Sequence, residues 1–152
     1  MKSLKITLSI LLVGIIPITS FAQEKESIWI TNYEEALMVS KKENKSILMS
    51  FSGSDWCANC MRLEKMVFST EAFKKYATEN FVLLQLDFPY KKKNKLAPAL
   101  TKQNDELAEK YNKTGTFPTV LILSPEEKVL GITGYKKRSA EAYVTHLKAL
   151  VK

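Results

Sequence analysis

Cysteine and histidine are scarce in this chain of 152 residues, which has only Cys57, Cys60 and a single histidine, His146. Two cysteines separated by two residues cannot join distant segments, so a disulfide between them would constrain the unfolded chain little. A structural zinc site takes four ligands, and this pair would supply only half of them. Structural stabilisation is therefore a poor explanation for the two thiols, and a chemical role is the better hypothesis.

The hydrophobic run at the N-terminus is too short to span a bilayer, which takes about 20 residues. Lys2 and Lys5 precede this run, which extends over about 6–18 and is followed by Ser20-Phe21-Ala22. A basic start, a short apolar stretch and small residues before the cleavage point are typical of a secretory signal peptide. The alternative is an uncleaved membrane anchor, and the absence of cysteine at the cleavage point argues against a lipoprotein. We therefore predict a signal peptide at 1–22 and an exported, periplasmic domain at 23–152.

The overall composition, 45% hydrophobic and 26% charged, is ordinary for a soluble globular protein, and no internal repeat is present. The formal net charge of +7 falls to +5 without residues 1–22, which hold two lysines and no acidic residue. Four of the remaining lysines, Lys91, Lys92, Lys93 and Lys95, crowd one loop. Export disfavours a nucleic-acid partner, so we interpret this loop as solvated. An acidic protein or an anionic membrane surface is the functional alternative.

Predicted helices and strands alternate along the chain. Helices are expected at 33–43, 57–66, 71–78 and 105–111 and after a cap at Ser139, and strands at 46–52, 81–87, 119–123 and 129–132. The caps of the first and third helices are expected at Thr31 or Asn32 and at Ser69 or Thr70. Residues 88–104 are predicted to form a polar connector. This order predicts a single α/β domain with a central mixed sheet and helices on both faces.

Cys57 and Cys60 fall where a buried strand gives way to a helix. A thiol at a helix N-terminus lies near unpaired backbone N–H groups, which favour the thiolate together with the helix dipole. We therefore expect the Cys57 thiol to project into solvent, to have a pKa below that of a free thiol and to act as the nucleophile. Cys60 shares the inner face of the helix with Leu63 and Val67 and is expected to stay protonated until it resolves the intermediate.

Two motifs in this chain resemble the paired signature of the thioredoxin superfamily. They are Trp56-Cys57-x-x-Cys60 after one strand and Thr116-Phe117-Pro118-Thr119 before another. The segments FSGSDWCANC, LDFP, KQNDELAEKY and TGTFPT further resemble the DsbH-like periplasmic disulfide reductases, and the superfamily resemblance covers about 28–151. It implies a thioredoxin fold, a redox disulfide between the cysteines and a cis Pro118 that faces it. It also implies substrate contacts from Trp56, Phe117 and Pro118, with neither cofactor nor metal.

These features predict an exported thiol–disulfide oxidoreductase, most consistent with a reductase of disulfide-bonded proteins. Cys57 would attack the substrate disulfide, Cys60 would release the product, and a membrane electron donor of the DsbD type would reset the pair. The Ala58-Asn59 pair lacks the histidine that holds the thiolate of strong oxidants, which favours reduction. A monomer is expected, without a nucleic-acid partner. The alternatives are an isomerase or oxidase of the same fold and, in a different class, an exported copper(I)-binding chaperone.

One feature of thioredoxin itself is missing from this chain. Thioredoxin has a buried aspartate on the strand before the motif, which is thought to accept the proton of the resolving cysteine. Allowing one extra residue in the turn, that position is Ser50, which lacks a carboxylate. Glu64, one turn beyond Cys60, and Asp87, at the end of the next strand, are the substitutes to consider.

The single histidine and the methionines near the motif are given structural interpretations. His146 lies far along the chain from the cysteines, so we expect a structural or surface role for it rather than a catalytic one. Met49, Met61 and Met66 are expected to fill gaps in the core.

Overall fold

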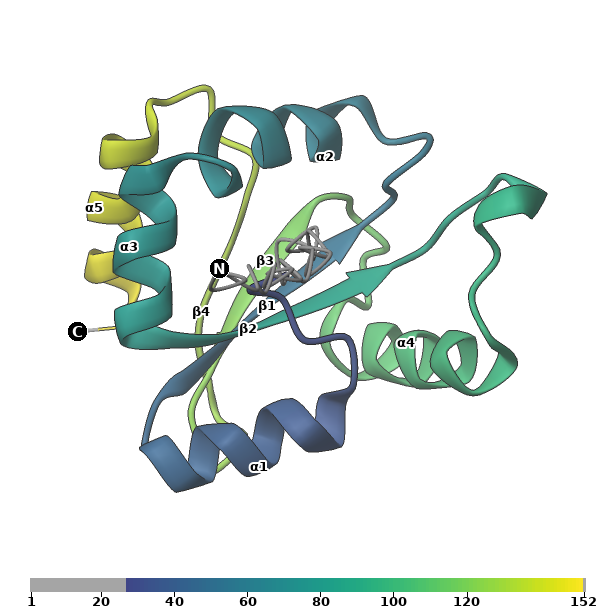
Figure 1. The fold of residues 1–152 in the computed structure, drawn as a ribbon, viewed down its shortest axis with the longest axis horizontal. Helices are drawn as coiled ribbons and strands as arrows, with labels where there is room; N and C mark the ends of the chain where they lie inside the picture. The colour runs from purple at the N-terminus through teal and green to yellow at the C-terminus, as the bar shows by residue number, and fades with distance from the viewer. Residues whose placement is uncertain (1–26, 152) are drawn as a thin grey trace, which may run out of the picture.

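The computed structural model describes residues 27–151, so the predicted signal peptide lies outside the described residues. The chain forms a four-stranded sheet in the order β2-β1-β3-β4, with helices on both sides (Figure 1). Strand β1 (Ser46–Ser52) pairs in parallel with β2 (Phe81–Asp87) and antiparallel with β3 (Thr119–Leu123). Strand β4 (Val129–Gly134) pairs antiparallel with β3. The predicted mixed sheet is thereby confirmed.

One face of the sheet carries the helix of the cysteine motif. It is covered by α2 (Ala58–Leu63), η1 (Glu64–Phe68), α3 (Glu71–Asn80) and α5 (Ala140–Leu150) (Figure 1). The core on this face includes Leu48, Leu63, Val67, Phe68, Phe73, Val120, Ile122 and Tyr143. Full burial of a large apolar side chain contributes roughly 1.5–3 kcal/mol to folding. The motif helix therefore rests on one of the two apolar cores of the domain.

The opposite face of the sheet is covered by α1 (Tyr33–Glu43) and α4 (Pro98–Tyr111) (Figure 1). Its core includes Ala36, Leu37, Ile47, Met49, Phe51, Leu84, Leu86, Leu107 and Leu121. Successive residues of β1 thus enter opposite cores, because side chains alternate across a strand. This explains why β1 is a continuous apolar run rather than an alternating one.

Polar side chains fix where three of the helices begin. Asn32, Thr70 and Ser139 are the N-caps of α1, α3 and α5, and each side chain accepts a hydrogen bond from a backbone N–H in the first turn. A cap of this kind contributes about 1 kcal/mol to stability. The predicted caps are therefore confirmed, with Asn32 and Thr70 chosen from the two candidates at each position.

Three helices differ from their predicted bounds, the smallest difference being in α3, which ends at Asn80 rather than near residue 78. Helix α4 begins at Pro98 instead of Asp105, because proline at the first helical position leaves no backbone donor unsatisfied and has the helical φ already set. The helix predicted at 57–66 ends at Leu63 as an α-helix and continues as the π-helix η1. Val67 and Phe68, both in this π turn, are buried in the core.

Between β2 and α4 the chain leaves the body of the domain. We call residues 88–97 the basic arm; it contains the short 3-10 helix η2 (Lys92–Asn94) and projects beyond the sheet (Figure 1).

Of the three methionines predicted to fill the core, only Met49 is buried, whereas Met61 and Met66 are exposed. No helix within residues 27–151 is both long enough and apolar enough to cross a membrane.

Candidate functional site

The two cysteines form a disulfide at the start of α2. Cys57 is the N-cap of this helix, and its Sγ accepts a hydrogen bond of 3.2 Å from the backbone N–H of Cys60. The first N–H groups of a helix have no partner inside the helix. In the reduced pair, the same donor and the helix dipole would stabilise negative charge on the Cys57 sulfur.

The exposure of the two cysteines differs less than the sequence suggests. Cys57 is 7% exposed and Cys60 is 4% exposed, so the prediction that Cys57 projects into solvent is wrong for the disulfide-bonded state. In this state the Cys57 sulfur is bonded to that of Cys60, which lies on the buried face of α2. The neighbouring Trp56, at 48% exposed, presents the large apolar surface of the motif.

The second motif lies beside the first. The Phe117–Pro118 peptide bond is cis, and Pro118 lines the same cavity as Cys60. The rings of Trp56 and Phe117 are 5.4 Å apart between centroids and meet edge to face at 66°, which is a favourable geometry for an aromatic pair. The structure therefore brings all five residues singled out from the sequence into one region.

Phe88 belongs to this aromatic cluster, a position that its sequence context alone does not reveal. The backbone carbonyl of Phe88 accepts a hydrogen bond of 2.7 Å from the indole Nε1–H of Trp56. Its ring lies 5.3 Å from that of Phe117, measured between centroids. The available sequence signal was the segment LDFP, in which Phe88 directly follows a strand that neighbours the one leading to the cysteines.

Gly53 makes room for the indole ring of Trp56. A Cβ atom at Gly53 would lie 2.3 to 2.6 Å from the nearest three ring atoms of Trp56, so any other residue here would displace the ring. The backbone carbonyl of Gly53 also accepts a hydrogen bond of 2.9 Å from the backbone N–H of Cys57. Glycine at this position therefore allows the ring to sit directly against the turn that precedes Cys57.

Asp87 binds the turn of the cysteine motif to the end of β2. Its carboxylate accepts hydrogen bonds from the backbone N–H and the hydroxyl of Ser54, at 2.9 and 2.6 Å, and from the Phe88 N–H at 3.0 Å. Both carboxylate oxygens of Asp87 are therefore engaged in hydrogen bonds that hold the turn in place. Asp87 is therefore a positioning residue, which weakens its candidacy as the proton acceptor of Cys60.

Asp55 binds the same turn to the basic arm. Its carboxylate accepts from the backbone N–H groups of Tyr90 and Lys91, at 2.9 and 3.0 Å, and from the Asn94 side-chain amide at 2.8 Å. Desolvation works to raise the pKa of Asp55, but these donors and the charge of Lys91 outweigh it and hold the pKa below its ordinary value. The carboxylate is thus ionised while it holds the arm.

A cavity of about 310 Å³ lies against Cys60 between α2 and the sheet. Its polar lining includes Ser50, Gln85 and Glu64, and a volume of this size admits several water molecules. Glu64 accepts a hydrogen bond of 2.8 Å from the hydroxyl of Ser69. Of the two carboxylates considered as proton acceptors, Glu64 is the one that shares a cavity with Cys60.

His146 connects α5 with β4. Its Nε2 lies 2.9 Å from the hydroxyl oxygen of Thr133, at hydrogen-bond distance. Desolvation and the positive charges of Arg138 and Lys136 hold its pKa below the ordinary value.

Within residues 27–151, no group of three or more His, Cys, Asp or Glu side chains is arranged to hold a metal ion.

Comparisons with known proteins agree with this geometry. A family model described as thioredoxin-like matches residues 28–125. The disulfide bond reductase DsbH of Chlamydia pneumoniae is 33% identical over 121 residues, which cover 80% of this chain and 71% of that relative. A solved structure of a DsbH oxidoreductase superposes with a TM-score of 0.75 and 29% identity, over 95% of this chain and 94% of that chain.

A second relative is considerably longer than this chain. The thioredoxin-related protein DsbJ of Chlamydia pneumoniae is 32% identical over 131 residues, which cover 84% of this chain and 37% of DsbJ. The chain therefore spans little more than a third of that protein, and the similarity concerns the thioredoxin-like part shared by the two.

Proposed function

Because the chain belongs to the thioredoxin-like family and is a thiol–disulfide oxidoreductase, we propose that it acts as a periplasmic protein-disulfide reductase. Its substrates are disulfide-bonded proteins, and its partners exchange thiols and disulfides with it. The observation that carries the proposal is the position of Cys57, whose sulfur caps α2 and accepts the N–H of Cys60. A sulfur in this position is suited to attack as a thiolate.

The reaction starts from the reduced pair. The Cys57 thiolate attacks one sulfur of the substrate disulfide, which breaks that bond and releases the other sulfur as a thiolate. Cys60 then loses its proton and attacks the Cys57 sulfur, which frees the second substrate thiol and leaves a Cys57–Cys60 disulfide. Two electrons pass to the substrate, and the oxidised pair is the state of the present structure.

Two observations support reduction over oxidation. The relative at 33% identity is named a disulfide bond reductase. Between the cysteines, Ala58 and Asn59 are exposed and Asn59 accepts a hydrogen bond from Arg62 within α2, so this pair offers no imidazole to the Cys57 sulfur. A thiolate with fewer stabilising contacts makes the reduced form less favoured, and the potential of the couple is then lower.

Substrate contacts are assigned to the surface around the disulfide. The exposed ring of Trp56 offers apolar area, and the backbone of Phe117 next to Pro118 offers hydrogen-bonding groups to an extended substrate segment. The edge-to-face contact between Trp56 and Phe117 holds these two parts of the surface together. Backbone pairing of this kind accepts many sequences, which suits an enzyme that acts on folded or partly folded proteins.

The proton of Cys60 is assigned to Glu64. Both residues line the cavity beneath α2, and its polar lining allows water to connect them. Ser50, at the position where thioredoxin has its aspartate, is buried in the same lining and offers a hydroxyl along this route. A base positioned in this way speeds the second step of the reaction, in which the Cys60 thiolate forms.

Export and resetting complete the proposal. A cleaved signal peptide at 1–22 delivers a domain at 23–152 to the periplasm, where a membrane electron donor of the DsbD type returns the Cys57–Cys60 disulfide to two thiols. The domain is proposed to act as a monomer. Because the compartment itself is oxidising, a reductase there depends on such a donor for every turnover.

The test is reduction of insulin by residues 23–152 with dithiothreitol as the electron donor. The proposal predicts rapid, catalytic precipitation of the reduced insulin chains, well above the rate with dithiothreitol alone. A chain that instead binds one copper(I) ion tightly and gives no turnover would be a metal-handling module, which would contradict the proposal.

A further inference from the structure

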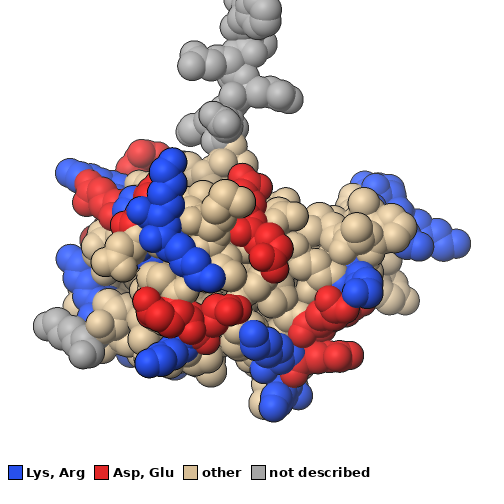
Figure 2. Space-filling model, turned by 90° about the horizontal axis from the view of Figure 1, so that it is seen from below, with Lys and Arg blue, Asp and Glu red and all other residues tan. Residues whose placement is uncertain are grey.

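The basic arm is the most strongly charged exposed feature beside the cysteine motif. Lys91, Lys92, Lys93 and Lys95 are all exposed on it, and the ion pairs found among the described residues involve none of them. Tyr90, at the base of this cluster, is 87% exposed. Figure 2 shows blue side chains gathered at the projecting end of the molecule, which is the arm of Figure 1.

The arm is fixed to the cysteine motif rather than free in solvent. The Asp55 carboxylate binds three donors of the arm, Trp56 donates to the Phe88 carbonyl, and the Phe88 N–H donates to the Ser52 carbonyl at 2.8 Å. Asp55 is two residues from Cys57, and two residues span at most about 7 Å. The base of the arm is therefore fixed to the turn that leads directly into the reactive disulfide.

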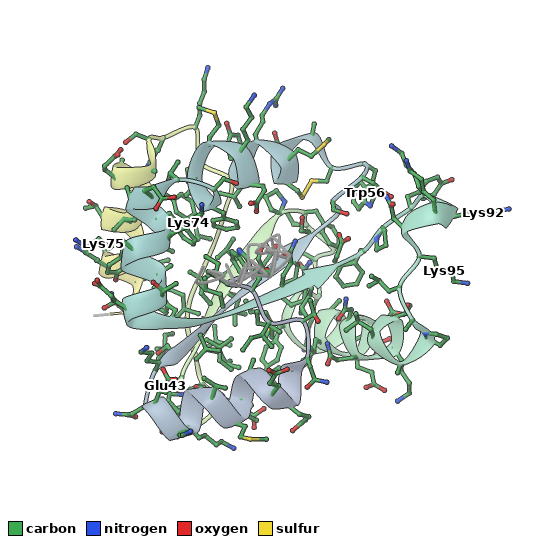
Figure 3. All side chains as sticks on the ribbon, in the orientation of Figure 1. Glu43, Trp56, Lys74, Lys75, Lys92 and Lys95 are labelled. Atoms are coloured by element: carbon green, nitrogen blue, oxygen red, sulfur yellow. A yellow bond between two sulfur atoms is a disulfide. The ribbon has the colours of Figure 1, made fainter. Side chains whose placement is uncertain are left out.

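The lysine side chains extend outward from this fixed base. Figure 3 shows Trp56 beside the base of the arm, with Lys92 and Lys95 pointing away from the body of the domain. A segment bound across Trp56 and the Phe117–Pro118 turn would thus have positive charge on one flank. Since the backbone of the arm is already held by hydrogen bonds, the conformational cost of binding is confined mainly to the lysine side chains.

We propose that the basic arm recognises an acidic segment beside the disulfide of the protein substrate. This inference rests on the proposed function and adds a substrate class to it. Exposed charges attract a partner of opposite sign during encounter and fix its orientation. Each exposed lysine contributes modestly, but several lysines on one fixed segment act together. The arm thereby selects substrates by the charge next to their disulfide.

The test compares three disulfide-linked peptides of equal length whose disulfide is flanked by three Glu, three Gln or three Lys residues. The measured quantity is the ratio of kcat/KM for the acidic peptide to kcat/KM for the neutral one. We expect a ratio of about ten at low ionic strength that approaches one in 0.5 M NaCl, because salt screens exposed charges. A ratio of one at low salt, with all peptides reduced, would overturn the inference and leave the reductase intact.

Matched variants assign the preference to the arm. The triple variant Lys92→Gln, Lys93→Gln, Lys95→Gln should lower the ratio to about one, and the corresponding Glu variants should make the Lys-flanked peptide the preferred substrate. The control replaces Lys41, Lys42 and Lys75 by Gln, three exposed lysines on α1 and α3. Lys75 lies at the opposite side of the molecule from the arm (Figure 3). Equal loss of the ratio in the control would overturn the inference.

A membrane is the competing partner for a cluster of lysines. Vesicles with 30% phosphatidylglycerol distinguish it, because a surface that binds anionic lipid would sediment with them and lose this binding in the triple Gln variant. That result together with a peptide ratio of one would replace the inference by lipid binding. Failure of the wild-type chain to reduce even the neutral peptide would instead contradict the proposed function.

Discussion

The indole Nε1–H of Trp56 donates to the backbone carbonyl of Phe88 at 2.7 Å. This hydrogen bond ties the residue directly before Cys57 to the first residue after β2. It orients a ring that is half exposed and that contacts Phe117 edge to face. One side-chain donor thus connects the cysteine motif, the base of the basic arm and the segment that ends in the cis peptide bond.

Replacement of Gly53 by Ala tests the packing of the Trp56 ring against the turn before Cys57. The added Cβ would lie 2.3 Å from a ring atom, so the ring must move or the fold must be strained, at a cost of about 1–3 kcal/mol. We expect Gly53→Ala to lower insulin-reduction activity and thermal stability. The same substitution should cost much less in a Trp56→Ala background, because the clash is absent. Equal costs in the two backgrounds would contradict the assigned contact.

Single replacements of the cysteines should have different outcomes. Cys57→Ser should reduce insulin turnover to the background rate, because no nucleophile remains. In the Cys60→Ala variant, Cys57 should still attack the substrate, but the mixed disulfide should accumulate. Mass spectrometry detects it as an adduct that dithiothreitol removes. Loss of turnover in both variants with no trapped adduct would contradict the division of roles between the two residues.

Glu64→Gln tests the proton acceptor. Without a carboxylate in the cavity beside Cys60, the second step should slow by about ten- to a hundredfold, since a positioned base contributes at least this much. Stopped-flow trapping should then show a longer-lived mixed disulfide at neutral pH, whereas the control Glu109→Gln, an exposed residue on α4, should behave as the wild type. An unchanged lifetime in Glu64→Gln would remove Glu64 from the mechanism.

The hydrogen bonds between the Asp55 carboxylate and the basic arm should weaken at low pH. Its folded-state pKa lies below the ordinary value of 3.8, so the stabilisation is fully present above pH 3.8 and is lost as the pH falls through the folded-state pKa. Protection of the Tyr90 and Lys91 amides against hydrogen exchange should fall over that range. At neutral pH, Asp55→Ala should lower their protection about tenfold and the control Glu109→Ala should not. Unchanged protection in Asp55→Ala would contradict the contact.

Much of the sheet could be predicted because its strands carry the signal in their own residues. The first three strands are short apolar runs, and their predicted bounds agree with β1 (Ser46–Ser52), β2 (Phe81–Asp87) and β3 (Thr119–Leu123). Strand β4 (Val129–Gly134) extends two residues beyond the expected range of 129–132. It is partly exposed, so burial marks its end less clearly.

The parts that could not be predicted depend on contacts between segments distant in the sequence. Nothing near Asp55 in the sequence indicates that its carboxylate binds residues 90–94. The position of Phe88 beside Phe117 likewise follows from the pairing of β2, β1 and β3 rather than from any local pattern. The burial of Cys57 is observed in the disulfide-bonded state, whereas the prediction of an exposed sulfur concerned the reduced pair.

A reductase needs a Cys57–Cys60 pair that donates electrons readily, and its equilibrium reduction potential at pH 7 decides whether this pair does so. The potential follows from the fraction of disulfide in defined redox buffers. We expect about −270 mV, as for thioredoxin. A potential of about −120 mV, as for a strong oxidant, would show instead that the pair is built to accept electrons.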